Sequence, residues 1–432
     1  MLQEEQRGMN VQSIKPATAE PVMSERRVSL IGALLVAVGP ISMALFTPAM
    51  PEIVDAFGTT EAAVKMTLSM YFAGFAFAQL VCGPLSDGFG RKPITVAFMG
   101  IYLVASAIAL ISPTIEVLIA ARFLQGVGAA VGVAISRAIV RDLFTNERSA
   151  RIMNLIGLIL GIGPAFAPTL GGITMQLFGW HAIFLLMLVF GLIIIAVTQI
   201  SMVETVKRDL SRIRPAALVK SYGSLLRDGY FMTSSLVLAG AVGALYTQAT
   251  VLPFIMMDRI GLTPTQFGVG MLMQSGMFFA GSLVVRQIMG RFGAYRIVPV
   301  GLVFIFIGSA AMAVGLRIFD PTFLSVMGPV AFYSFGIAFI MPAMSTASLA
   351  PFPHIAGAAA SMGGFLQMGG GLAGGAAAAA FGDPVLALAT IIPAMGMLAV
   401  VSWLVWRTLP EPAFASAVLA REPQVPPVPP AE

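Results

Sequence analysis

Long runs of apolar residues, separated by short polar interruptions, extend along almost the whole chain. A helix that crosses a membrane needs about 20 mainly apolar residues, and the sequence contains twelve windows of that kind. These windows lie near residues 28–50, 62–86, 93–112, 115–140, 150–175, 180–203, 228–256, 264–288, 297–316, 322–344, 355–380 and 384–407. The pattern predicts an all-α membrane protein with twelve transmembrane helices.

The longest polar interruption in this pattern lies near the middle of the chain and separates six spans from six. We expect a tail at 1–27, a first half at 28–203, a linker at 204–227, a second half at 228–407 and a Pro-rich tail at 408–432. The dipeptide Phe89-Gly90 follows the second span of the first half, and Phe292-Gly293 follows the second span of the second half. This weak repeat favours two duplicated six-helix halves with a central site between them.

Composition agrees with a membrane protein and argues against several kinds of chemistry. Of the 432 residues, 58% are hydrophobic and 10% are charged, whereas an average soluble protein has about 25% charged residues. The single cysteine, Cys82, allows no internal disulfide, and two histidines offer few ligands for zinc. The sequence has no Gly-rich phosphate loop of the ATPase type. We therefore expect no metal, no cofactor and no enzymatic activity.

Positive charge is concentrated in alternate loops. With the N-terminus inside, the central linker alone holds six bases, while the outer loops hold only Lys65, Arg259 and Arg317. Because cytoplasmic loops are enriched in Lys and Arg, this asymmetry predicts that both termini are cytoplasmic. The net charge of +5 then belongs to a membrane face that meets anionic lipid, and it does not indicate a nucleic-acid partner.

Three motifs at the ends and centres of spans carry a family resemblance. Span 2 ends in Gly83-Pro84-Leu85-Ser86-Asp87-Gly88-Phe89-Gly90-Arg91-Lys92-Pro93. Span 4 contains Arg122-Phe123-Leu124-Gln125-Gly126, and span 5 contains Gly163-Pro164-Ala165-Phe166-Ala167-Pro168-Thr169-Leu170-Gly171-Gly172. Together these segments resemble the major facilitator superfamily (MFS) and, within it, the Bcr/CflA group of twelve-span drug:proton antiporters.

The resemblance covers nearly the whole chain between the two tails. It implies an MFS fold, with twelve transmembrane helices in two six-helix halves, and a monomeric transporter in the bacterial inner membrane. It further implies efflux of small amphipathic compounds by alternating access, nominally in exchange for protons.

The turn after span 2 is expected to act as a gating latch. The resemblance implies that Asp87 caps a facing helix N-terminus of the other half and that Arg91 pairs with Asp142 below span 4. Carboxylates are favoured at helix N-termini, and Arg–carboxylate pairs can be bidentate. One position departs from the family pattern, because Gly88 stands where a basic residue is usual. The alternative is an ordinary positively charged turn.

Span 5 is the second expected gating element. Its prolines disfavour a straight helix, and its glycines allow another helix to approach closely. A bent, tightly packed helix between the halves would bias which side opens, and the alternative is a packing kink without a gating role. The gating residues predicted here are Gly163, Pro164, Pro168, Gly171 and Gly172.

Arg122 is the principal candidate for the substrate cavity. An ionised side chain at the centre of a bilayer costs about 2.5–3.5 kcal/mol on insertion scales. Arg122 is therefore expected to face the protein interior, with Gln125 on nearly the same helix face; alternatively it lies shallow and reaches the outer interface. Polar and aromatic residues of other spans complete the predicted cavity: Tyr71, Phe75, Gln79, Tyr246, Gln274, Tyr333 and Gln367.

The family comparison also reveals a missing acid. Members usually carry an aspartate in span 1 at the position that is Ala44 here. Glu52 and Asp55 are the nearest carboxylates along the chain, about 12 Å or more away at 1.5 Å per residue, and they are the remaining proton-coupling candidates. The alternative function is thus a weakly proton-coupled exporter or a facilitator of a specific neutral or anionic metabolite.

Overall fold

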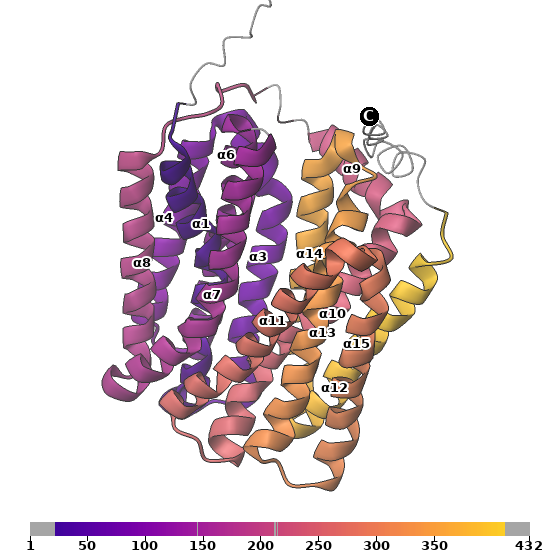
Figure 1. The fold of residues 1–432 in the computed structure, drawn as a ribbon. Coiled ribbons are helices and arrows are strands. Elements are labelled where there is room, and N and C mark those ends of the chain that lie inside the picture. The colour runs from indigo at the N-terminus through magenta and orange to yellow at the C-terminus, as the bar shows by residue number, and fades with distance from the viewer. Residues whose placement is uncertain (1–21, 145, 211–212, 214, 411–432) are drawn as a thin grey trace, which may run out of the picture.

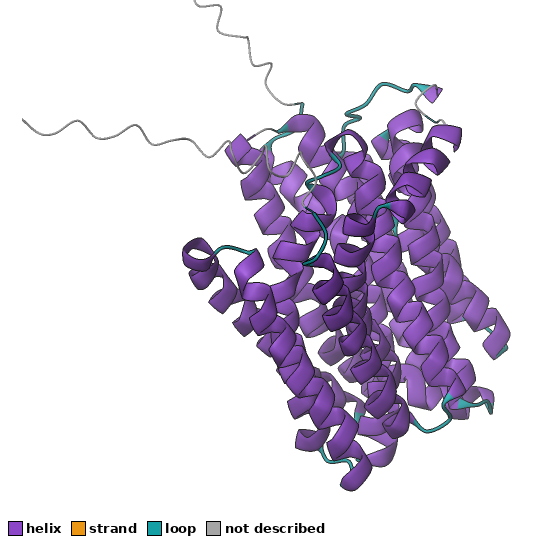
Figure 2. Ribbon diagram, turned by 90° about the vertical axis from the view of Figure 1, so that its right-hand side faces the viewer, coloured by secondary structure: helices purple, strands orange, loops and turns teal. Residues whose placement is uncertain are grey.

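The computed structural model describes residues 22–410 except 145, 211–212 and 214, and in this part of the chain it is helical without strands. The predicted tails 1–27 and 408–432 lie almost entirely outside the described residues. The helices stand roughly parallel in one bundle (Figures 1 and 2). The prediction of an all-α membrane fold is confirmed.

The first half begins with a broken helix and continues with five further spans. Span 1 is formed by α1 (Glu25–Phe46), the 3-10 turn η1 (Thr47–Ala49) and α2 (Met50–Phe57). It is followed by α3 (Glu61–Phe89), α4 (Arg91–Leu110), α5 (Ile115–Ala129), α6 (Val131–Leu143), α7 (Asn146–Phe178) and α8 (Trp180–Ser201). Helices α5 and α6 together make span 4.

The second half follows a short helix in the linker, α9 (Pro215–Arg227). It consists of α10 (Gly229–Pro253) with the π-helical turn η3 (Phe254–Arg259), α11 (Pro264–Phe292), η4 (Tyr295–Ile297), α12 (Val298–Ile318), α13 (Phe323–Leu349), η5 (Pro353–Ile355), α14 (Ala356–Ala380) and α15 (Pro384–Trp406). Because span 7 runs on to Arg259, it takes in Asp258. The predicted window 228–256 stopped short of this carboxylate.

Ten of the spans in the described residues are long and apolar enough to cross a membrane. Helices α7 and α14, of 33 and 25 residues, occupy the positions of the other two predicted spans. Glycine and alanine make up most of α14, and their small side chains dilute its hydropathy.

The repeated Phe-Gly dipeptide marks equivalent helix ends in the two halves. Gly90 ends α3 with φ +106°, and Gly293 ends α11 with φ +83°. An L side chain is strained at such angles, whereas glycine adopts them readily. The repeat therefore reflects one backbone turn that is used twice, between spans 2 and 3 and between spans 8 and 9.

Each half has its own apolar core. One cluster of buried residues is built almost entirely from residues 23–202, and a second from residues 230–403. The halves meet chiefly along two helix pairs, α3 with α14 and α7 with α11. We call the end of the bundle that carries Arg91, Arg141, Arg227 and Arg407 the basic face, uppermost in Figure 1, and the other end the opposite face.

Candidate functional site

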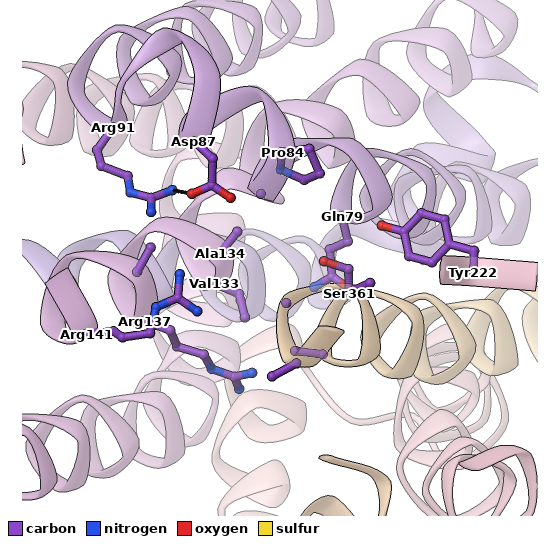
Figure 3. Close-up of a pocket in the computed structure, with 16 residues that line it drawn as sticks. Gln79, Pro84, Asp87, Arg91, Val133, Ala134, Arg137, Arg141, Tyr222 and Ser361 are labelled. Atoms are coloured by element: carbon purple, nitrogen blue, oxygen red, sulfur yellow. Dashed lines mark ion pairs between the residues drawn. The ribbon is translucent and has the colours of Figure 1, made fainter. Parts of the chain in front are cut away.

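A buried arginine organises the basic face of the first half. The Arg91 side chain is 3% exposed, and its Nη1 lies 2.6 Å from Asp87 Oδ1 (Figure 3). Its Nε donates to Asp142 Oδ2 at 3.0 Å, and Nη1 also donates to Ser86 Oγ at 2.5 Å. Thr205 of the linker donates to the same Asp142 oxygen at 2.9 Å. The ion pair between Arg91 and Asp142 is thus present, and Arg91 joins the ends of spans 2 and 4.

A different acid caps the helix that follows this turn. Glu204 accepts hydrogen bonds from the backbone amides of Arg91 and Lys92, at 2.9 and 3.1 Å, and so satisfies the N-terminus of α4. Gly88 lies beneath the linker, where an added Cβ would overlap the Ile213 side chain. The linker therefore fills the space that a basic residue at position 88 would need. The capping of a facing helix by Asp87 stays a prediction.

Close backbone contacts join α7 and α11 near the opposite face. A Cβ at Gly172 would overlap the carbonyl oxygen of Pro264, and one at Gly268 would overlap that of Pro168. The Thr169 hydroxyl donates to the Gly268 carbonyl at 3.0 Å. Glycine thus lets the two helix backbones touch, and this contact holds the halves together at that end.

The other predicted gating positions of span 5 lie against span 1. A Cβ at Gly171 would overlap the Leu45 carbonyl oxygen, and one at Gly163 would press on the Ile41 side chain. The side chain of Pro164 lies outside the described residues. Span 5 therefore packs on α11 with one side and on α1 with the other, while the gating role itself stays a prediction.

A buried lysine provides another contact between the halves near the opposite face. Lys65, 1% exposed, pairs with Glu61 at 2.8 Å within α3. Its Nζ also lies 4.9 Å from the ring centroid of Phe254, which belongs to the second half. Lys65 was expected among the outer-loop bases, and the sequence alone did not predict this contact.

Arg122 is completely buried inside the first half. Its guanidinium carbon lies 4.3 Å from the ring centroid of Phe46 and 4.5 Å from that of Tyr71. Nη1 donates to Gln125 Oε1 at 2.8 Å, and Gln125 in turn donates to Ser106 Oγ at 2.8 Å. The Nε and Nη2 atoms have no hydrogen-bond partner. The charge is therefore held by two aromatic rings and an amide, without a carboxylate among the described residues.

The position of the missing span-1 acid lies close to this cluster along the chain. Ala44 is buried in α1, two residues before Phe46. Glu52 and Asp55 are exposed on α2, and no ion pair joins either of them to Arg122 among the described residues.

Two of the predicted cavity tyrosines are anchored to backbone carbonyls inside their own halves. Tyr71 donates to the Gly39 carbonyl at 2.9 Å, and Tyr333 donates to the Gly240 carbonyl at 3.1 Å. The ring of Phe75 lies against Gly39 as well. The structure thus brings Tyr71 and Phe75 together with the Arg122 cluster and places Tyr333 apart from it in the second core.

Two further predicted residues lie at the contact between the halves, and a third lies on α14. The Tyr246 ring packs on Phe72 of the first half, with centroids 5.2 Å apart. Gln79 is 7% exposed, and its side-chain oxygen lies against Gly364 of α14 without a hydrogen-bond partner. Gln367 is half-buried on α14.

A buried glutamine pair joins α10 and α11. Gln274 donates to Gln248 Oε1 at 2.6 Å, and the Gln248 Nε2 atom, fully buried, has no partner. Gln274 was predicted from the sequence as a cavity residue, whereas Gln248 was not. The signal was available, because an amide within an apolar span needs an internal hydrogen-bond partner.

Comparison with known proteins agrees with this architecture. The sequence matches the Major Facilitator Superfamily over residues 32–378. It is 26% identical over 378 residues to Multidrug resistance protein D of Escherichia coli K12, covering 86% of this chain and 93% of that protein. It is 27% identical over 344 residues to the uncharacterized MFS-type transporter YdgK of Bacillus subtilis 168, covering 78% of this chain and 85% of YdgK.

Solved structures share the fold at low sequence identity. A bacterial homolog of the human lysosomal transporter Spinster, inward-facing and occupied, has a TM-score of 0.66 at 15% identity and covers 88% of this chain and 95% of its own. A D-xylose–proton symporter has a TM-score of 0.70 at 14% identity, covering 90% and 98%. With twelve spans in two halves and a family match over most of its length, the chain is a transporter of the Major Facilitator Superfamily.

Proposed function

We propose that this transporter exports small amphipathic molecules from the cytoplasm by alternating access, as a monomer of the Bcr/CflA type in the bacterial inner membrane. Two relatives are named multidrug resistance proteins, D and MdtL, and they are 26–27% identical to this chain. The contacts between α7 and α11 close the halves at one end, while a cavity lies between them at the basic face. Rocking of the two halves against each other would open the end that α7 and α11 close and would close the basic face.

The buried and unpaired charge of Arg122 supports a preference for neutral or anionic substrates. An isolated charge in an apolar interior is costly to bury, and cation–π contacts of about 0.5–2 kcal/mol each offset only part of that cost. Two guanidinium nitrogens remain without a partner. An anion that reached Arg122 would satisfy them, whereas a cation would be repelled.

The absence of an acid at position 44 supports weak dependence of transport on a proton gradient. The position expected to bind the coupled proton is Ala44, which cannot titrate. Proton exchange through Glu52 or Asp55 is the second candidate mechanism. It is favoured by the exposure of both carboxylates on α2, where protons can reach them from water.

Counterflow in proteoliposomes tests this proposal. Vesicles loaded with ethidium, 4-hydroxybenzamide or 4-hydroxybenzoate represent a cation, a neutral compound and an anion, and each is measured with and without a pH gradient. We expect exchange of the neutral compound or the anion to exceed that of the cation and to persist when the gradient is collapsed. Exchange confined to the cation and dependent on the gradient would overturn the proposed preference.

A further inference from the structure

A cavity of about 230 Å³ lies between the two halves at the basic face. Its walls come from α3 and α6 of the first half, from the linker helix α9, and from the first turns of α14. Tyr222 of α9 donates to the Leu80 carbonyl of α3 at 2.6 Å and so ties the linker to the cavity wall. Burial raises the pKa of the Tyr222 phenol, which therefore stays protonated and keeps donating at physiological pH.

Two arginines that have no ion-pair partner among the described residues give this cavity a positive charge. Arg137 and Arg141 lie one turn apart on α6, and both line the cavity. Arg91 at its edge is neutralised by Asp87 and Asp142. No described carboxylate pairs with Arg137 or Arg141, whose side chains extend from α6 beside the cavity in Figure 3. Like charges one turn apart on a helix repel each other, so a bound anion would relieve both.

The wall that α3 contributes contains a buried hydrogen-bond acceptor that no described protein group satisfies. Gln79 lines the cavity and is more than nine-tenths buried, yet its side-chain oxygen has no partner. Buried polar atoms are normally hydrogen-bonded, so an unsatisfied one indicates a hydrogen-bond donor that is not part of the protein. The oxygen lies against Gly364 beside the cavity, so a ligand that donates a hydrogen to it would complete the site once the Gln79 side chain turns toward the cavity.

The size of the cavity limits the ligand. Pockets for drug-sized molecules usually have volumes of about 300–1,000 Å³, so 230 Å³ suits a compact molecule. We propose that this cavity binds a small organic anion, with its carboxylate or phosphate on Arg137 and Arg141 and a hydroxyl or amide group that donates to Gln79. The site is the first point of contact for a substrate that enters from the basic face. This assignment rests on the proposed export function and narrows its substrate class.

Direct binding tests the site separately from transport. The full-length protein is placed in nanodiscs of phosphatidylcholine, and binding of radiolabelled 4-hydroxybenzoate is measured at equilibrium. We expect the double variant Arg137→Gln/Arg141→Gln to bind at least about tenfold more weakly, because charged hydrogen bonds are lost. Arg291→Gln removes an exposed base from the same face outside the cavity and should bind within about twofold of the parent.

The neutral analogue and Gln79 provide independent readouts. 4-Hydroxybenzamide should bind at least about tenfold more weakly than 4-hydroxybenzoate. Benzoate, which lacks the hydroxyl donor, should bind more weakly than 4-hydroxybenzoate to the parent protein, and Gln79→Met should remove that difference. Equal binding of the acid and the amide, or unchanged binding by the double variant, would overturn the anion site.

Lipid composition distinguishes a free anion from a headgroup. In nanodiscs of phosphatidylglycerol, binding of 4-hydroxybenzoate should be retained. If phosphatidylglycerol abolishes binding of 4-hydroxybenzoate, and if the protein retains bound phosphatidylglycerol only when Arg137 is present, the cavity binds a lipid headgroup and the proposal is overturned. Counterflow without binding of the anion in this cavity would refute this inference alone. Binding of the anion without movement of any solute would refute the export function.

Discussion

Replacing Asp142 with asparagine should destabilise the protein more than the same change at Asp87. Both carboxylates contact Arg91, but their exposure differs. The side chain of Asp142 is 16% exposed and receives a hydrogen bond from Arg91 Nε at 3.0 Å. The side chain of Asp87 is 42% exposed, so water screens its pair with Arg91.

The contacts set the size of this difference. Breaking a buried ion pair costs about 3–5 kcal/mol when the remaining charge has no partner. In Asp142→Asn, Arg91 keeps Asp87 and Ser86, and the asparagine oxygen can still accept one bond, so we expect a loss of about 1.5–3 kcal/mol. For Asp87→Asn the loss should be about 0.2–1 kcal/mol, as for exposed pairs.

The single cysteine supplies the assay. Cys82 is fully buried, so a thiol-reactive fluorophore labels it only as the helices come apart. For a chain of 432 residues, a loss of about 2 kcal/mol corresponds to a drop in the unfolding midpoint of roughly 2 °C. Asp320→Asn, which neutralises an exposed carboxylate at the opposite face, serves as the control. Equal midpoints for the Asp142 and Asp320 variants would show that Arg91 gains no stability from its pair with Asp142.

Four further outcomes are expected. Asp87→Asn should lower transport at normal membrane levels, because it removes the charge at the latch; unchanged counterflow would leave the latch unsupported. Gly172→Ala should lower the free energy of unfolding by about 1–3 kcal/mol through overpacking, whereas Gly276→Ala, where a Cβ meets open space, should not. Lys65→Met should lengthen the distance between spin labels placed on the two halves at the opposite face, by removing a contact that joins them; an unchanged distance distribution would count against it. An impermeant maleimide should label Ser224→Cys in inside-out vesicles but not in intact cells, and labelling from outside would reverse the topology.

Much of the fold follows from apolar length alone. Each predicted window coincides with a long helix or with consecutive helical segments, because a span must bury about 20 residues in lipid whatever it packs against. The ends were harder to predict. The window for span 1 stopped at residue 50, yet the helix continues as α2 through Glu52 and Asp55 to Phe57. Charged residues end a hydropathy window, but they do not end a helix that emerges into water.

The site was only partly predictable for a related reason. The cost of inserting a charge into the bilayer predicted that Arg122 faces the protein interior. Helix geometry predicted that Gln125, one turn away, lies on nearly the same face. The rings that enclose Arg122 come from other helices, and Glu204 caps α4 from 113 residues away. Such partners are determined by how the helices pack, which the spacing of residues within one helix does not reveal.

Dependence of transport on the proton gradient tests the central claim most directly. Uptake of ethidium and of 4-hydroxybenzoate is measured in inside-out vesicles with the gradient intact and collapsed, for the parent protein and for Ala44→Asp. We expect the parent to move the anion in both conditions, and Ala44→Asp to shift it toward gradient-driven uptake of the cation. Strong gradient-driven pumping of ethidium by the parent, abolished by Glu52→Gln or Asp55→Asn, would contradict the proposed anion preference and assign proton coupling to α2.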